Sequence, residues 1–121
     1  MLLDTNILIG LLADEQRTRG KVEEWKREGK QLCISAVNIA EVLSFTELDA
    51  RAVELIRAFT RTFFIIPFEQ SIAETAGALR REYTLSFADA CIASTALTHN
   101  IPLVTRDRGF RKVADLTILE I

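Results

Sequence analysis

The chain has 121 residues, of which 49% are hydrophobic and 26% are charged. This length and balance fit one globular domain over residues 1–121 with a buried core, and they exclude an intrinsically disordered chain. The 15 basic and 17 acidic residues give a formal net charge of −2, which by itself does not point to nucleic acid. The longest apolar stretch is too short to span a membrane and no basic leader precedes it, so we expect a cytoplasmic protein.

Short apolar segments alternate along the chain with longer amphipathic ones. In chain order they predict a strand at Met1–Asp4, helices at Ile7–Leu12 and Glu15–Glu28, a strand at Gln31–Ser35, helices at Val37–Phe45 and Asp49–Thr62, a strand at Phe63–Pro67, helices at Gln70–Tyr83 and Phe87–His99, and strands at Leu103–Thr105 and Leu116–Glu120. The third strand is apolar on both sides, as a strand covered on both faces should be. This alternation predicts a parallel α/β sandwich.

The cysteines, the histidine and the tryptophan each have a predicted structural role. Cys33 and Cys91 stand among apolar neighbours, which favours small buried hydrophobic residues over metal ligands or a redox pair. The one histidine, His99, stands where the last helix ends, and we expect it to cap that helix. Trp25 lies on an otherwise strongly charged helix, so it either packs on the core or marks an interface.

Four acids stand where an active site is expected. In open parallel sheets, ligands bind beyond the carboxyl ends of the strands, and Asp4 and Asp107 lie at two such ends. Glu41 and Asp89 lie in helical segments with almost entirely apolar neighbours, where a carboxylate is costly to bury unless it is paired, hydrogen-bonded or bound to a cation. A hydroxyl residue stands close to each acid.

Each acid also has a purely structural interpretation. Asp4 fits a helix N-cap, and Asp107 fits a turn. Glu41 fits a narrow polar stripe that faces solvent together with Asn38. Asp89 fits a capping box with the serine three residues before it. No single acid decides between these interpretations and a shared site.

Carboxylates that converge on one pocket repel one another, which raises their pKa values and opposes folding. Mg²⁺ or Mn²⁺ relieves this repulsion, because hard cations prefer oxygen ligands. One such metal, or a pair, activates water and neutralises a phosphodiester in the transition state. Setting the four acids aside leaves 13 acidic residues against 15 basic ones, so the net charge does not exclude an RNA substrate.

Four segments in this order resemble the motifs of PIN domains, most closely those of the VapC-type toxins of bacterial and archaeal toxin–antitoxin pairs. They are Leu3–Leu8, Ile34–Glu41, Asp89–Leu97 and Pro102–Asp107, and the similarity continues to the final strand. The resemblance implies a PIN-like three-layer α/β/α sandwich with a central parallel sheet of about five strands. It also implies a Mg²⁺- or Mn²⁺-dependent endoribonuclease, usually a homodimer, that an antitoxin chain inhibits.

By matching positions, the resemblance implies a set of metal-binding catalytic acids: Asp4, Glu41, Asp89 and Asp107. It makes Asn6 and Thr105 polar supports of the site. Near the last acid stand four basic residues that either hold RNA phosphates or form a solvated turn: Arg106, Arg108, Arg111 and Lys112. The chain departs from the family pattern after Glu41, where a glycine that is often present is absent.

Two other classes of protein share parts of this pattern. A PIN domain that serves RNA processing or quality control would have identical chemistry, and the sequence does not separate it from a toxin. A receiver-like signalling module is disfavoured, because it needs paired acids after its first strand and a lysine after its last. This chain has Asp4 alone, and residues 113–121 contain no lysine.

Overall fold

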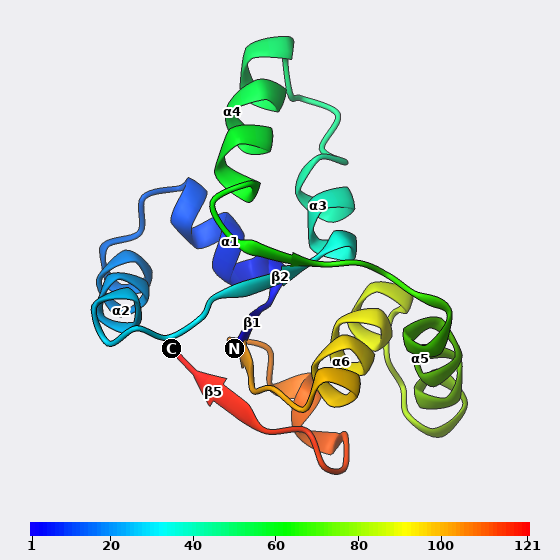
Figure 1. The fold of residues 1–121 in the computed structure, drawn as a ribbon. Helices are drawn as coiled ribbons and strands as arrows, with labels where there is room; N and C mark the ends of the chain where they lie inside the picture. The colour runs from blue at the N-terminus through cyan, green and yellow to red at the C-terminus, as the bar shows by residue number, and fades with distance from the viewer.

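The computed structural model describes residues 1–121 and contains one five-stranded parallel sheet in the order β3-β2-β1-β4-β5. The strands are β1 (Leu2–Leu3), β2 (Cys33–Ser35), β3 (Phe64–Ile66), β4 (Leu103–Thr105) and β5 (Ile118–Glu120). The helices are α1 (Thr5–Leu12), α2 (Gln16–Arg27), α3 (Ala36–Val42), α4 (Ala50–Thr60), α5 (Gln70–Glu82), α6 (Phe87–His99) and the 3₁₀-helix η1 (Arg108–Lys112). The predicted α/β sandwich about a parallel sheet is confirmed (Figure 1).

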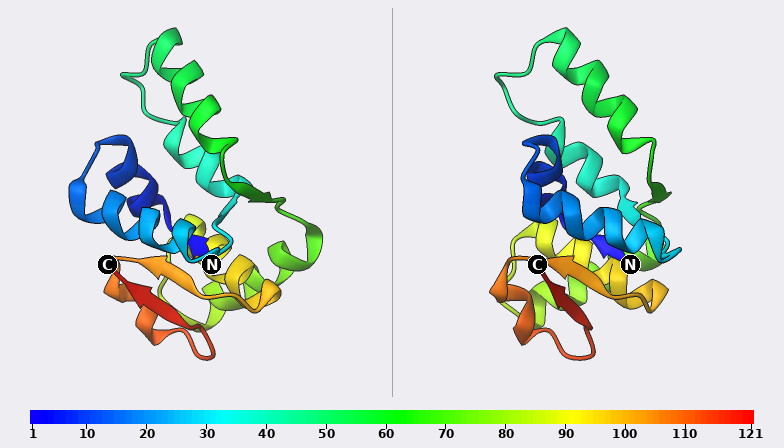
Figure 2. Two further views of the ribbon diagram at one scale, coloured as in Figure 1. Left: turned by 60° about the vertical axis from the view of Figure 1, so that its left-hand side comes forward. Right: turned by 90° about the vertical axis from the view of Figure 1, so that its left-hand side faces the viewer.

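Neighbouring residues on each strand supply two separate cores, because successive side chains of a strand point to opposite faces. Leu2 and Leu103 pack with residues of α5 and α6. The next residues along the same strands, Leu3 and Val104, pack with residues of α1, α2, α3 and α4. The sheet is therefore covered by helices on both faces, and α3 and α4 form an arm that projects from it (Figure 2).

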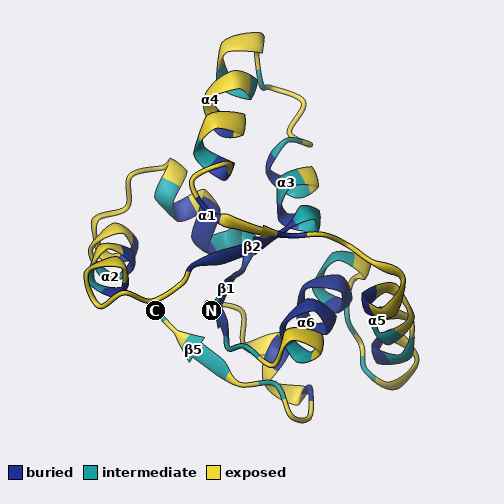
Figure 3. Ribbon diagram, viewed as in Figure 1, coloured by how far each residue is buried: buried dark blue, intermediate teal, exposed yellow.

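Helix α6 is the most deeply buried helix. Its residues Ala90–Ala96 are all buried, as the lack of charge in this segment predicts (Figure 3). The Ser94 hydroxyl donates to the Ile72 carbonyl of α5 at 2.6 Å, and the Thr95 hydroxyl donates to the Cys91 carbonyl at 2.7 Å. The polar groups of this helix therefore have partners inside the core, which burial requires.

Strand β3 departs from the prediction. It pairs only with β2 and lies at the edge of the sheet. Phe64 is 59% exposed and Ile65 is 37% exposed, so the interpretation of this strand as covered on both faces is wrong (Figure 3). An apolar strand at an edge presents unpaired backbone groups and apolar side chains to solvent or to a partner.

The single residues of interest take defined places. Cys33 and Cys91 are buried and free, as predicted. Trp25 is 7% exposed in the core on the α1–α4 face of the sheet, so it is a core residue. The C-cap of α6 is Asn100, which adopts the left-handed conformation that asparagine tolerates at helix ends. The expectation that His99 caps this helix is therefore wrong, because His99 is its last helical residue.

The boundaries of the elements differ from the prediction by a few residues. Helix α1 begins at Thr5 directly after Asp4, and α3 ends at Val42 instead of Phe45. Such shifts are expected, because helix ends fray and the hydrophobic pattern of a sequence does not mark the last hydrogen-bonded residue. No helix of the structure has both the length and the apolar character needed to cross a membrane.

Candidate active site

The carboxyl edge of the sheet brings together segments that are distant in the sequence. Leu3 pairs with Val104 in the sheet, so the next residues, Asp4 and Thr105, lie side by side. The Thr105 hydroxyl donates a hydrogen bond to Asp4 Oδ2 at 2.6 Å. Asn6, the second residue of α1, donates from Nδ2 to the same hydroxyl at 3.4 Å. At the carboxyl ends of β1 and β4, the apolar strands are therefore followed by a group of hydrogen-bonded polar side chains.

Asp4 combines two of the roles predicted for it. Its Oδ1 accepts a hydrogen bond from the Thr5 backbone N–H at 2.8 Å, and it is the N-cap of α1. Its Oδ2 is engaged by Thr105, and the residue is only 5% exposed. One carboxylate oxygen of Asp4 caps α1 and the other accepts a hydrogen bond from Thr105. Asp4 can therefore be both a helix cap and a buried residue of the site.

Glu41 is held by a chain of hydrogen bonds that starts at the end of β2. The Thr5 hydroxyl donates to Glu41 Oε1 at 2.6 Å and accepts from Asn38 Nδ2 at 2.9 Å. Asn38 Oδ1 accepts from the Ser35 N–H at 2.7 Å, and Asn38 is fully buried. The alternative of a solvent-facing polar stripe is therefore wrong for Asn38. The hydrogen bonds from Asn38 to Thr5 and from Thr5 to Glu41 hold the carboxylate of Glu41 against the start of α1.

Asp89 and Asp107 keep parts of their structural roles. The Ser86 hydroxyl accepts from the Asp89 backbone N–H at 3.1 Å, which is one half of the predicted capping box. Asp107 Oδ1 accepts from the Gly109 N–H at 2.8 Å and caps η1, as its turn interpretation predicts. The Asp107 backbone N–H donates to Thr105 Oγ1 at 3.0 Å, which ties this loop to the partner of Asp4.

The electrostatics of the site connect the four acids in pairs. The pKa of Asp4 is raised to about 6, chiefly by burial; the hydrogen bonds that it accepts oppose this increase, and the charges of Asp89 and Glu41 add to it. Burial also raises the pKa of Asp89, and the charge of Asp107 adds to this effect. Each acid thus lies within the electric field of at least one other, as a shared site requires.

The predicted metal ligands influence one another electrostatically, but they do not form a ready-made metal-binding cage. No three carboxylate, imidazole or thiol groups form a set that could hold one ion by themselves. Asn6 Oδ1 is buried and has no hydrogen-bond partner, so an oxygen with an unused lone pair faces this region. Mg²⁺ usually keeps several waters and takes only one or two carboxylates, so this donor set fits such an ion.

The basic residues beside Asp107 are Arg106, Arg108, Arg111 and Lys112. Arg106 pairs with Glu15, and Arg111 pairs with Glu120. Lys112 donates to a backbone carbonyl, whereas Arg108 forms no ion pair. Their contact with RNA stays a prediction, and three of the four side chains would have to exchange a partner to make it.

Two contacts of the site were not foreseen from the sequence. Asn38 completes a capping box with the Ser35 backbone and side chain, and the Ser-x-x-Asn spacing is a signal that could have placed it. Arg106 reaches across to Glu15 and Thr18 above Gly10, where a Cβ atom would lie 2.8 Å from the guanidinium. No local pattern predicts a pair of residues that are 91 positions apart.

Comparisons with known proteins identify the family of the chain. The family model described as PIN domain matches residues 1–116. A search among curated proteins finds no match. The chain is 34% identical to a chain of a toxin–antitoxin complex from Klebsiella pneumoniae, with a TM-score of 0.81, over 99% of this chain and 98% of that one.

Two further solved structures have the same fold. FitAcB from Neisseria gonorrhoeae is 25% identical with a TM-score of 0.77, over 98% of this chain and 95% of that one. VapBC2 from Rickettsia felis, bound to a fragment of promoter DNA, is 22% identical with a TM-score of 0.85, over 99% and 97%. The family indicated by the sequence motifs is thus confirmed, and the chain belongs to the PIN domain family.

Proposed function

We propose that residues 1–121 form a single domain that hydrolyses RNA phosphodiester bonds with Mg²⁺ or Mn²⁺ in the cytoplasm, as the toxin of a toxin–antitoxin pair. The observation that carries the proposal is the placement of Asp4, a buried carboxylate with a pKa of about 6, in the field of Glu41 and Asp89. Such a cluster is unfavourable without a cation. Membership of the PIN family supports the assignment to a nuclease.

The proposed roles follow from the contacts. The carboxylates that would hold the cation are Asp4, Glu41, Asp89 and Asp107. A bound divalent cation supplies charge neutralisation at the phosphodiester and activation of water. Thr105 orients Asp4 and the backbone of Asp107, and the Thr5 hydroxyl orients Glu41. Asn6 supports the site through Thr105. Preorganised oxygens reduce the cost of reaching the reactive geometry.

An antitoxin partner is part of the proposal. The Klebsiella pneumoniae relative, at 34% identity, is part of a toxin–antitoxin complex. Large apolar side chains stay exposed on α1 and in the α3–α4 arm, including Ile9 at 40%, Phe45 at 50% and Leu55 at 61%. Exposed apolar surface of this kind is typical of a face that binds another protein.

The proposed enzyme is tested directly with purified protein. It should cleave a structured RNA at unpaired positions when Mg²⁺ or Mn²⁺ is present, and chelation with EDTA should stop the cleavage. A perfectly paired duplex of the same composition serves as the control substrate and should stay intact. Cleavage that persists in EDTA, or no cleavage with either metal, would contradict the proposal.

The homodimer is proposed from the open edge of β3. Phe64 and Ile65 on this strand and Phe68 just after it are 59%, 37% and 37% exposed. Sedimentation should therefore give a mass of twice the 13.6 kDa chain. Phe64→Glu should shift the protein to the monomer, whereas Leu55→Glu on α4 should leave the dimer intact. A monomeric wild-type protein at micromolar concentration would rule the dimer out.

A further inference from the structure

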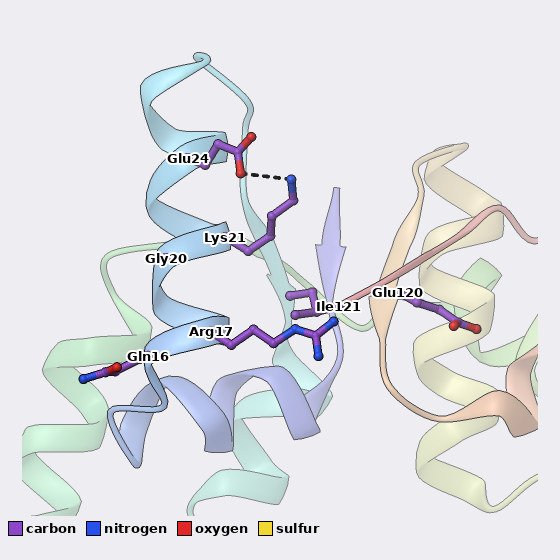
Figure 4. Close-up of a pocket in the computed structure, with 7 residues that line it drawn as sticks. All are labelled: Gln16, Arg17, Gly20, Lys21, Glu24, Glu120 and Ile121. Carbon is purple, nitrogen blue, oxygen red and sulfur yellow. Dashed lines mark hydrogen bonds and ion pairs between the residues drawn. The ribbon is translucent and has the colours of Figure 1, made fainter.

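A pocket of about 330 Å³ lies between α2 and the end of β5, outside the acid cluster (Figure 4). We propose that this pocket is a subsite that holds one nucleotide of single-stranded RNA next to the cleaved bond, through a phosphate contact with Arg17. The inference rests on the proposed function, because it extends the substrate path of that same site. Its experiment also contains an arm that does not depend on RNA cleavage.

The register of the sheet places this pocket beside the acids. Thr105 pairs with Glu120 on β5, and on its other side it lies next to Asp4. Neighbouring strands are about 4.8 Å apart, so the backbones of Asp4 and Glu120 lie roughly 10 Å from each other across the carboxyl edge. Glu120 lines the pocket. A flexible strand of RNA that crosses the acid cluster along this edge therefore reaches the pocket.

The charges in the pocket leave one cation without a partner. Lys21 pairs with Glu24 at 3.0 Å, and Glu120 pairs with an arginine of η1. Arg17 forms neither a hydrogen bond nor an ion pair through its side chain, and Figure 4 shows this side chain extending toward Ile121. The unpaired cation in the pocket is thus the guanidinium of Arg17, and a guanidinium can bind a phosphate through two parallel hydrogen bonds.

The shape of the pocket favours a nucleotide over a bare anion. Gly20 leaves open space on the α2 side, since a Cβ atom there would meet nothing within 4 Å. Ile121 adds a half-buried apolar surface against which a ribose or a base can pack. The volume lies at the lower end of the range for small-molecule sites, about 300–1,000 Å³. A phosphate alone would leave most of this space unused.

The test compares Arg17→Ala with Arg27→Ala. Both residues are exposed arginines of α2 without an ion pair, so the two variants remove the same charge from the same helix. On a single-stranded RNA with several nucleotides on each side of the cut, Arg17→Ala should raise KM about tenfold with kcat unchanged, as loss of a charged hydrogen bond predicts. Arg27→Ala should match the wild-type protein. An unchanged KM in Arg17→Ala would overturn the inference.

The second arm is an NMR titration of the protein with uridine 5′-monophosphate and, separately, with inorganic phosphate. The nucleotide should shift the amide signals of Gly20 and Lys21, which line the pocket, in the wild-type protein and in Arg27→Ala, and should leave them in place in Arg17→Ala. Equal affinity for inorganic phosphate would overturn the nucleotide assignment. If the wild-type protein cuts no RNA but shows these shifts, the proposed nuclease fails and the pocket stands.

Discussion

Replacement of Asp89 by asparagine is expected to remove nearly all RNA cleavage and to leave the fold intact. The helix cap at this position uses the Asp89 backbone N–H, which donates to the Ser86 hydroxyl and survives the substitution. The carboxylate itself lies in the field of Asp107 and Asp4, where loss of its charge weakens any cation bound there. Metal activation supplies several kcal/mol, so the initial rate should fall by about 1,000-fold.

The matched control for this variant is Ser86→Ala. It removes the acceptor of the cap and should lower the free energy of unfolding by about 1 kcal/mol while cleavage stays close to the wild-type rate. Thermal melts measure the fold, and initial rates on the same RNA measure the activity. A folded Asp89→Asn protein with near-normal cleavage would move the catalytic cation away from α6.

A second large effect concerns the stability of the metal-free protein as a function of pH. The pKa of Asp4 is about 6 in the folded protein and near its ordinary value of 3.8 in the unfolded chain. At pH values between these two pKa values, the folded state binds more protons than the unfolded chain. The free energy of unfolding therefore falls as the pH rises from about 4 to about 6. The full shift corresponds to a loss of about 3 kcal/mol at pH values above 6. Urea denaturation in EDTA measures it.

Asp4→Asn isolates this contribution, because other carboxylates titrate in the same range. The difference in unfolding free energy between the wild-type protein and Asp4→Asn should change by about 3 kcal/mol across this window and stay constant above it. Mg²⁺ or Mn²⁺ at neutral pH should stabilise the wild-type protein and not the variant. An equal metal response in both proteins would show that the cation binds elsewhere.

Much of the fold could be predicted because local patterns report secondary structure directly. The uncharged segment Ala90–Leu97 predicted a buried helix, and α6 has the predicted bounds Phe87–His99. The position of a strand within a sheet is different, because it depends on pairings between distant segments. Phe64 and Ile65 have the composition of a central strand, and only the strand order shows that they lie at an edge.

Less of the candidate site than of the fold could be predicted from the sequence. The residue types and their places at strand ends indicated Asp4 and Asp107, but the hydrogen bonds that orient them come from the tertiary structure. Asn38 shows the limit: its spacing from Ser35 is a local signal for a capping box, but the burial of its amide and its contact with Thr5, which orients Glu41, depend on the tertiary structure. The metal-binding roles of the four acids stay predictions, to be decided by the experiments above.

The hydrogen bond between Thr105 and Asp4 joins residues that are 101 positions apart, and β1 in the middle of the sheet needs both β2 and β4 as neighbours. Contacts of such long range form late, because a large loop must close first. On the ribosome, Asp4, Glu41 and Asp89 are all synthesised before β4, which carries the Thr105 hydroxyl that contacts Asp4. For the ribonuclease proposed above, this order of assembly is expected to keep the unfinished chain inactive, so that it does not degrade the messenger from which it is being translated.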